Sequence, residues 1–176
     1  MKTTGVVRRI DDLGRIVIPK EIRRTLRIRD GESLEIFVDK EMIALKKYSS
    51  MDDMTEIAKT LADTISSTIK KNIMVTDRDK FIVITGEDKK SYLNKSISRT
   101  LEQQMNDREI LIEKNLHSIE FLDGKKEEHT YIINPINVKG DVVGLVIIFS
   151  NDEMISDADE KIAVVMSDFL SKHIEE

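Results

Sequence analysis

Hydrophobic and polar positions alternate over short stretches in the first part of the chain, which predicts strands joined by tight turns. Residues 2–10 are rich in β-branched side chains, and a second extended stretch follows at residues 15–18. Between them, the Asp-Asp-Leu-Gly sequence at residues 11–14 is typical of a turn, because acidic side chains bond their own backbone and glycine accepts a positive φ. Over residues 34–45 the alternation returns on both sides of an Asp-Lys-Glu turn, which predicts a hairpin.

A short helix is expected between these two extended regions. Pro19 keeps Ile18 extended and suits the first turn of a helix, so the helix should occupy roughly residues 19–26. Ile22 and Leu26 lie four residues apart and should both face inward, while the basic side chains of the segment take the other faces.

Two amphipathic helices are expected to flank the rest of the chain. The first starts at residues 53–56, which resemble a capping box, and the second starts at residues 156–159. Both carry apolar stripes at helical spacing, and the second stripe has the spacing of coiled coils and bundles. Either each stripe covers the sheet of its own domain, or the first and last helices of two chains form a four-helix bundle. The first stripe is Met54, Ile57 or Ala58, Leu61, Ile65 and Ile69, and the second is Ile155, Ala158, Ile162, Val165 and Phe169.

Between these helices the pattern predicts a sheet with an inserted helix. The expected helix spans residues 91–105, and an Asp-Arg-Asp turn separates the first two strands. The expected strands are residues 72–77, 80–85, 110–112, 119–122, 131–136 and 142–149. The order of two strands, a helix, several strands and a final helix predicts an α+β domain.

Charge divides the chain near residue 50. Residues 1–50 hold 12 Lys and Arg against 8 Asp and Glu, a net charge of +4, whereas the rest hold 16 against 25, a net charge of −9. Such asymmetry is typical of a chain in which one part meets a polyanion. We therefore expect two domains, residues 1–50 and residues 51–176, and the short connection at residues 47–50 should couple them mechanically.

Composition excludes several kinds of chemistry. The chain has no cysteine, which rules out disulfides, a thiol nucleophile and cysteine-ligated metal sites. No apolar run reaches the ~18 residues of a membrane span, and no export signal is apparent, so we expect a cytoplasmic protein. His117, His129 and His173 share no metal-ligand spacing and are expected to be exposed. Without a phosphate loop or nucleophile signature, we expect no enzymatic activity, no catalytic residue, no cofactor and no metal.

The arginines of the first domain lie in a sequence that resembles a known family. The match runs over residues 3–47 and includes Gly5, the Asp-Asp-Leu-Gly-Arg turn, the Ile-Pro pair and the Arg-Arg-Thr-Leu end of the helix. It is similar to the swapped-hairpin DNA-binding domain of the transition-state regulator (AbrB) family, in which two chains interleave their hairpins into one β-barrel-like dimer. The resemblance implies double-stranded DNA as a partner and places the DNA contacts on Arg8, Arg15, Arg23 and Arg24, with Arg9 beside them.

A dimer of the first domain is also expected on physical grounds. About fifty residues with so few large apolar groups bury too little surface to be stable alone. A symmetric dimer would duplicate the arginines on a two-fold face that suits duplex DNA. Because no long recognition helix is expected, phosphate contact and shape readout are the favoured mode of DNA binding.

The second domain resembles a GAF-type sensor domain by its order of elements. Residue 27 is arginine where many family members have glycine, and residues 27–31 resemble the branch of the family that acts in sporulation. In that branch a GAF-type module follows the DNA-binding domain, here called the head. The expected fold is therefore a mainly-β swapped-hairpin dimer followed by an α+β GAF-like domain with flanking bundle helices. Asn94 and Lys95 begin the motif that some GAF domains use for cyclic nucleotides, but residues 96–98 do not continue it. Cyclic nucleotide is thus disfavoured, and an unknown small-molecule ligand is left open.

These features favour a DNA-binding transcriptional regulator, activator or repressor, of sporulation genes. It would form a dimer through the head and a tetramer through the helices of residues 53–69 and 155–174, with no membrane partner. An antitoxin that represses its own promoter is one alternative, since some antitoxins share this head. A small-molecule sensor whose head only drives oligomerisation is another.

Overall fold

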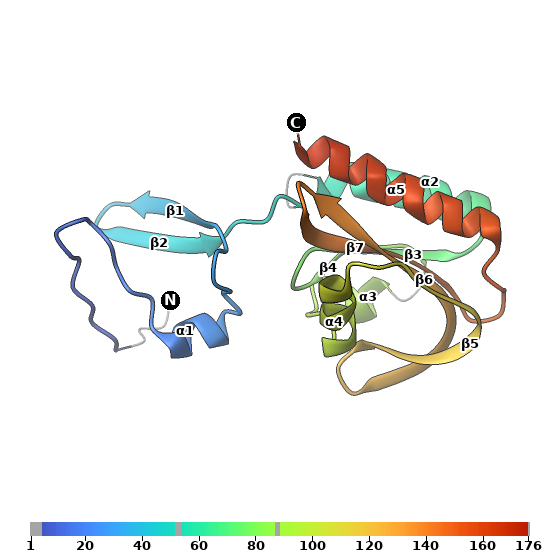
Figure 1. The fold of residues 1–176 in the computed structure, drawn as a ribbon, viewed down its shortest axis with the longest axis horizontal. Helices are drawn as coiled ribbons and strands as arrows, with labels where there is room; N and C mark the ends of the chain where they lie inside the picture. Colours follow the sequence, from blue (N-terminus) through green and yellow to red (C-terminus); the bar gives the residue numbers. More distant parts are fainter. Residues whose placement is uncertain (1–4, 52–53, 87–88, 176) are drawn as a thin grey trace. The chain divides into compact units, whose positions relative to one another are not determined.

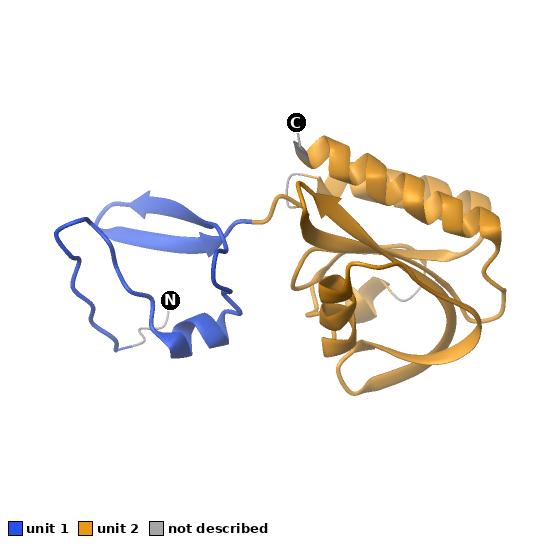
Figure 2. Cartoon of the chain, viewed as in Figure 1, with its two compact units in different colours: residues 1–48 blue, residues 49–176 orange. Residues whose placement is uncertain are grey.

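The computed structural model describes residues 5–51, 54–86 and 89–175 (Figure 1). The chain divides into two compact units, unit 1 over residues 1–48 and unit 2 over residues 49–176 (Figure 2).

Unit 1 contains one short helix and one hairpin. Helix α1 spans Lys20–Thr25, and β1 (Leu34–Asp39) pairs with β2 (Met42–Lys47) in antiparallel register. Lys40 closes the hairpin with a φ of 50°, the left-handed conformation that a two-residue hairpin loop requires. The helix and the hairpin lie where the sequence predicts them.

Two strands expected in unit 1, at residues 2–10 and 15–18, are not formed within the described residues, which leave out residues 2–4. Residues 5–10 and residues 15–18 belong to no sheet, because β1 and β2 pair only with each other. Leu26, which we expected to face inward, is exposed. Across the described residues 5–48 no apolar side chain is buried, so one copy of this segment cannot supply the inner face that the pattern assumes.

Unit 2 is built on a five-stranded antiparallel sheet with the strand order β4-β3-β7-β6-β5. Its strands are β3 (Asn72–Thr76), β4 (Phe81–Ile84), β5 (Leu111–Leu122), β6 (Lys125–Val138) and β7 (Asp141–Ser150). The last two expected strands appear as β6 and β7, whereas the two short strands expected before them form one long strand, β5. A register irregularity between Glu113 and His117 interrupts the pairing of β5 in the middle, which is where the apolar pattern fails.

Helices cover both faces of the sheet (Figure 1). Helices α2 (Thr55–Ile69) and α5 (Asp157–Glu175) pack together on one face, and α3 (Lys89–Tyr92) and α4 (Arg99–Asp107) lie on the other. Successive residues of a strand point to opposite faces, so neighbouring apolar residues pack into two separate cores. This burial on both faces explains the continuous apolar run of β7.

The helix expected over residues 91–105 is divided in two. Asn94 adopts a φ of 63° after α3, which ends that helix. Ser98 then caps α4, because its Oγ accepts a hydrogen bond from the Leu101 N–H at 3.2 Å. The left-handed asparagine and the capping serine mark the end of one helix and the start of the next, and the helical spacing of apolar residues does not show this break.

The stripe of α5 named from the sequence, which could either cover the sheet or face another chain, is not the face that covers the sheet. Ala163, Met166 and Leu170 are buried, whereas Val165 is 67% exposed and Phe169 is also exposed. The Asn134 side-chain amide on β6 donates to the Ala163 carbonyl at 3.2 Å, which fixes this orientation. Helix α5 therefore has two apolar stripes, and the one named from the sequence faces mainly outward.

In α2 the structure decides between the residues that the sequence left open. Ala58 is buried against the sheet, together with Ala62, and Ile57 is exposed. The start of this helix was expected at residue 53, which lies outside the described residues.

Candidate nucleic-acid interface

The five arginines of the expected DNA-binding set lie on three segments of unit 1. Two precede the turn of residues 11–14, one follows it, and two lie on α1. Their positions are Arg8, Arg9, Arg15, Arg23 and Arg24. All are exposed except Arg23, which is half-buried, so most of the set is accessible to a polyanion.

The turn before Arg15 is built around the Asp11 carboxylate. Its Oδ1 accepts from the backbone N–H of Leu13 at 3.0 Å and from that of Arg15 at 2.8 Å. The Asp11 carbonyl accepts from the Gly14 N–H at 2.9 Å, and Gly14 has a φ of 77°. This confirms the predicted turn and its glycine, since a side chain at this φ would be strained.

The same carboxylate also holds the side chain of Arg15. Asp11 Oδ2 accepts from Arg15 Nε at 2.8 Å. The hydrogen bonds from the Arg15 backbone, and then from its side chain, keep the pKa of Asp11 below its usual value. Asp11 is therefore charged at neutral pH and fixes both the backbone and the side chain of Arg15.

Helix α1 ends in a Schellman motif. The Ile28 N–H donates to the Arg23 carbonyl at 2.8 Å, and the Arg27 N–H donates to the Arg24 carbonyl at 3.3 Å. Arg27 takes a φ of 53°, which is the position where this motif usually has glycine. The departure from glycine at residue 27 thus falls on a backbone conformation that a side chain strains.

Arg23 is held by a different carboxylate. Its Nη1 donates to Asp30 Oδ1 at 2.5 Å, across the end of α1. A second ion pair, between Lys47 Nζ and Glu32 Oε1 at 3.2 Å, ties the hairpin to this corner, and Lys47 also donates to the Arg27 carbonyl at 3.1 Å. The sequence alone did not identify Asp11, Asp30 and Glu32 as partners of these basic side chains. Of the three pairs, only Asp11 and Arg15 have the four-residue spacing that can indicate an ion pair.

In unit 2 the face between the sheet and α3 and α4 is filled by aromatic side chains. Phe121 contacts Phe149 and Tyr92 edge-on, with ring centroids at 5.4 and 6.4 Å. His129 stacks on Phe121 with centroids 5.4 Å apart and is buried, so the expectation that it is exposed was wrong. The histidine lies on β6, not in a loop, and its ring completes the aromatic core.

A polar group closes the edge of this aromatic core. The Tyr92 hydroxyl donates to the Glu127 carboxylate, and Lys125 Nζ lies 3.1 Å from the hydroxyl and 2.9 Å from Glu127. Burial, and then the hydrogen bond to Glu127, raise the pKa of Tyr92 to about 12. The three side chains therefore form one hydrogen-bonded group at the surface of the aromatic core.

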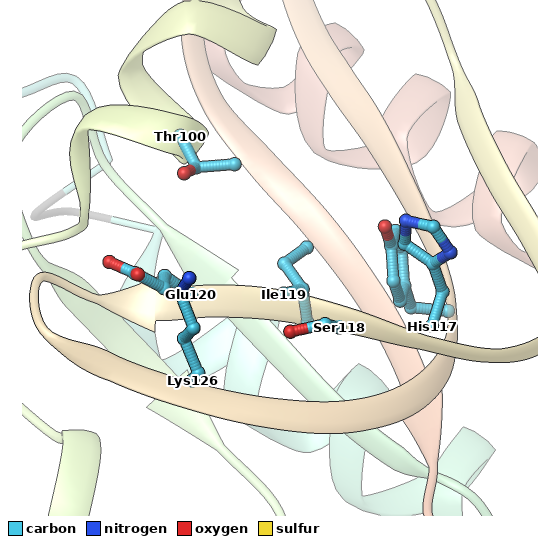
Figure 3. A pocket seen from close by; sticks show the side chains of 7 residues that line it. Thr100, His117, Ser118, Ile119, Glu120 and Lys126 are labelled. Atoms are coloured by element: carbon cyan, nitrogen blue, oxygen red, sulfur yellow. The ribbon is translucent and has the colours of Figure 1, made fainter.

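An open cleft of about 450 Å³ lies between α4 and β5 (Figure 3). Thr100 faces it from α4, and Glu120 and Lys126 lie on its opposite side (Figure 3). Its other lining residues are His117, Ser118, Ile119 and Tyr131. The lining combines polar and apolar surface, and most of the side chains that face the cleft carry a polar group.

Two further observations concern the described part of the chain. No group of three or more His, Asp or Glu side chains within it could hold a metal ion. None of its helices has the length and apolar character needed to cross a membrane.

Comparison with protein families gives two matches. Residues 53–175 match the family described as Stage V sporulation protein T C-terminal, transcription factor. Residues 7–53 match the family described as Antidote-toxin recognition MazE, bacterial antitoxin. The first match covers most of the chain and the second only its head.

Individual relatives agree with this division. The chain is 44% identical to Stage V sporulation protein T of Bacillus subtilis (strain 168), over 100% of both chains. It is 62% identical over 48 residues to Transition state regulatory protein AbrB of the same organism, covering 27% of this chain and 50% of that one. The GAF domain from Acinetobacter phosphoenolpyruvate-protein phosphotransferase has a TM-score of 0.55 at 15% identity, over 73% of this chain and 84% of that one. This last likeness shows the fold alone.

Proposed function

Because the chain belongs to the family of stage V sporulation protein T, a family of transcription factors, we propose how its two units share the regulation of transcription. The chain is a DNA-binding transcriptional regulator of sporulation, with an AbrB-like domain followed by a GAF-like domain. In our proposal unit 1 binds double-stranded DNA as a dimer, and unit 2 joins two dimers into a tetramer. The observation that carries the DNA-binding part is the exposed arginine set around an ordered turn and a capped helix.

The arginines of unit 1 are suited to phosphate contact. Arg8, Arg15 and Arg24 are exposed, and a guanidinium engages phosphate oxygens with two parallel hydrogen bonds. Helix α1 has only six residues, which is too short to act as a long recognition helix in the major groove. We therefore assign the set of five arginines mainly to backbone contact and shape readout.

The exposed apolar surface of unit 1 supports the dimer. Val7, Val17, Ile36, Val38 and Ile43 are all exposed, although β-branched residues at such density are typical of a core. A second copy of the unit would bury these side chains, and residues 5–10 and 15–18, which belong to no sheet in the described chain, could form strands with it. The DNA-binding surface would then form only in the dimer.

The outward stripe of unit 2 supports the tetramer. Val165 and Phe169 on α5 are exposed, and so is Ile57 on the neighbouring α2. Two helices that lie side by side with apolar outer faces can pair with the same two helices of another chain as a four-helix bundle. With the dimer of unit 1, this gives each chain two interfaces.

Binding to a duplex at a series of salt concentrations tests the assignment to DNA. For each of Arg15→Ala and Arg24→Ala, we expect weaker binding on preferred and scrambled duplexes alike, with the slope of log affinity against log salt reduced by about 1 per lost phosphate contact. Arg99→Ala, which removes an exposed arginine of unit 2, is the matched control and should leave the slope unchanged. Loss confined to the preferred duplex with an unchanged slope would replace phosphate contact by base readout.

Light scattering of a double variant tests the tetramer. Val165→Lys combined with Phe169→Lys places two charges in the apolar seam and should convert tetramers into dimers. Asn151→Lys adds a charge in an exposed bend of the same unit and should leave the mass unchanged. A double variant with the wild-type mass would show that the outward stripe is not an interface.

The remaining parts of the proposal follow from DNA binding. A regulator of transcription acts where the chromosome is, which for a bacterial protein is the cytoplasm. No enzymatic activity is needed for this role. The antitoxin alternative has support only over residues 7–53, so the match leaves out nearly all of unit 2, which has a GAF-like fold.

The interior of unit 2 bears on whether this unit holds a small-molecule ligand. The aromatic core, with Tyr92, Phe121 and His129, occupies the interior between the sheet and the helices α3 and α4, and the cleft beside β5 is open to solvent, not an enclosed pocket. We therefore propose assembly as the main role of unit 2. A thermal-shift screen of small molecules against the full chain tests this, because a specific ligand would raise the melting temperature.

A further inference from the structure

Two arginines of the DNA-binding set are each paired with a carboxylate, but through different nitrogens. Asp11 holds Arg15 at Nε, at 2.8 Å. Asp30 holds Arg23 at the terminal Nη1, at 2.5 Å. A guanidinium engages phosphate or a guanine edge with a pair of parallel N–H groups, so the nitrogen that is already occupied matters.

Arg15 is fixed at the base of its guanidinium and open at the end. Its side chain is 72% exposed, and Asp11 occupies Nε, the nitrogen closest to the backbone. The terminal Nη groups, which form the end-on fork, lie beyond this contact. The pairing therefore restrains the side chain without using the fork that would bind DNA.

Arg23 is fixed at the end of its guanidinium and covered at the base. Its Nη1 donates to Asp30, its Nε is buried, and its side chain is only 38% exposed. A phosphate that approaches the terminal edge meets a nitrogen already bound to a carboxylate. The Asp30 side chain is 94% exposed, so it can move aside when an anion replaces it.

We propose that Asp11 and Asp30 set the DNA affinity of unit 1 in opposite directions. Asp11 is a positioning residue that presents the terminal fork of Arg15 to DNA, because restraining a flexible side chain in advance lowers the entropy lost on binding. Asp30 is a competitor that occupies Arg23 until a DNA phosphate displaces it. The inference rests on the proposed DNA contacts of Arg15 and Arg23.

The Asp11 carboxylate divides its two roles between its two oxygens. Oδ1 accepts both backbone hydrogen bonds of the turn, and Oδ2 accepts from Arg15 Nε. Asp11→Asn can keep the first oxygen as an amide carbonyl while replacing the second by an NH₂ group, which cannot accept from Nε. The variant thus keeps the turn and removes the contact that positions Arg15.

Asp12→Asn provides the matched control for charge. Asp12 is exposed in the same turn, and its change removes the same single negative charge near the DNA surface. Any general gain in affinity from lower negative charge appears in this variant too. The effects of Asp11→Asn and Asp30→Asn are therefore read relative to Asp12→Asn, in the full chain and on one duplex.

Relative to Asp12→Asn, we expect Asp11→Asn to bind the duplex about two- to fivefold more weakly. We expect Asp30→Asn to bind it about two- to fivefold more tightly. These factors correspond to the free energy that exposed ion pairs usually contribute. The salt dependence separates the two cases further. Asp11→Asn should lower the slope of log affinity against log salt, as the Arg15 contact is partly lost, and Asp30→Asn should not. Equal affinities in all three variants, or shifts of the same sign, would overturn the proposal.

A double-mutant cycle separates positioning from a general effect on the fold. In an Arg15→Ala background, Asp11→Asn should no longer change affinity relative to Asp12→Asn, and in an Arg23→Ala background, Asp30→Asn should lose its effect. If Asp11→Asn weakens binding equally with and without Arg15, its role is structural and the positioning proposal fails. If Arg15→Ala and Arg23→Ala themselves leave binding unchanged, it is the proposed function of these arginines that fails.

Discussion

Side chains of unit 2 such as Phe121 and Leu145 are completely buried, whereas in unit 1 Phe37 exposes 44% of its surface and none of the described apolar side chains is buried. Both units nevertheless have well-defined local structure. Unit 2 holds its strands between two apolar cores, one beneath α2 and α5 and one beneath α3 and α4. Unit 1 is defined by turns, a helix cap and ion pairs at its surface.

The difference separates two ways of specifying a structure. Local hydrogen bonds fix the conformation of a turn or a helix end, but the free energy that stabilises a domain comes mainly from apolar burial. Unit 2 contains that burial within one chain. Unit 1 has apolar residues that are not buried, so its stability should depend on a second copy. The surface that presents the arginines should then depend on that copy as well.

The largest effect should come from truncating the core of unit 2. Phe121→Ala removes a buried ring that contacts four other aromatic rings, and we expect the free energy of unfolding of unit 2 to fall by about 3–5 kcal/mol. Denaturant unfolding followed by circular dichroism measures the loss. Leu116→Ala, on an exposed part of β5, is the control and should change the free energy by no more than about 0.5 kcal/mol.

Unit 1 should respond to protein concentration instead. If folding of this unit is coupled to dimerisation, its apparent free energy of unfolding rises by about 1.4 kcal/mol for each tenfold increase in concentration. Hydrogen exchange of the β1–β2 hairpin can be compared at several concentrations in the Val165→Lys, Phe169→Lys background, which removes the proposed seam of unit 2. Exchange rates that do not depend on concentration would mean that unit 1 is stable as a monomer and does not need a second copy.

The sequence predicts the fold best where the signal is local. The turn at residues 11–14, helix α1, the hairpin and strands β6 and β7 lie where pattern and turn chemistry place them. The sequence did not predict that the helix over residues 91–105 is divided or that β5 is continuous. A left-handed residue such as Asn94 and an irregularity within a strand cannot be recognised from the spacing of apolar residues. The sequence left the orientation of α5 open, because both of its faces carry apolar residues and a buried polar contact from Asn134 selects between them.

The candidate interface shows a similar limit. The arginines could be named from the resemblance of the head, and the structure places them on the segments expected. Their carboxylate partners could not be named in the same way. Asp11 lies four residues before Arg15, a spacing that a turn, not a helix, brings into contact, and Asp30 reaches Arg23 only after α1 has ended. Such partners follow from the path of the backbone, which is specified by the turn and the cap together.

A smaller effect is expected from the helix end of unit 1. Arg27→Gly removes a side chain from a residue with a φ of 53°, and relieving this conformation should stabilise the unit by about 1 kcal/mol. Thermal unfolding at a fixed protein concentration measures the gain. Arg29→Gly removes the same charge from a residue without a positive φ and should lower stability instead, since glycine costs backbone entropy there. If both variants lose stability, residue 27 is not strained.

The smallest effect concerns a turn that the two units share in form. In unit 2, Asp77 Oδ1 accepts from the backbone N–H groups of Asp79 and Lys80, each at 2.7 Å, much as Asp11 accepts in unit 1. Burial raises the pKa of Asp77 above its ordinary value, whereas the hydrogen bonds from Arg15 lower the pKa of the exposed Asp11. The hydrogen bonds of the turn favour the ionised aspartate in both units, but burial outweighs them at Asp77 and favours its neutral form.

The pH dependence of two matched variants tests this contrast. A folded-state pKa above the ordinary 3.8 means that ionised Asp77 costs stability at neutral pH, and that this cost disappears as pH falls through the folded pKa towards 3.8. Asp77→Asn should thus raise the melting temperature slightly at neutral pH, with a difference that shrinks as the solution is acidified. Asp11→Asn should lower it at neutral pH, because a lowered folded pKa gives stability that is present above 3.8 and lost only below it. Thermal unfolding of both variants and the wild type between neutral and acidic pH measures the two differences. Shifts of the same sign would mean that burial does not distinguish the two turns.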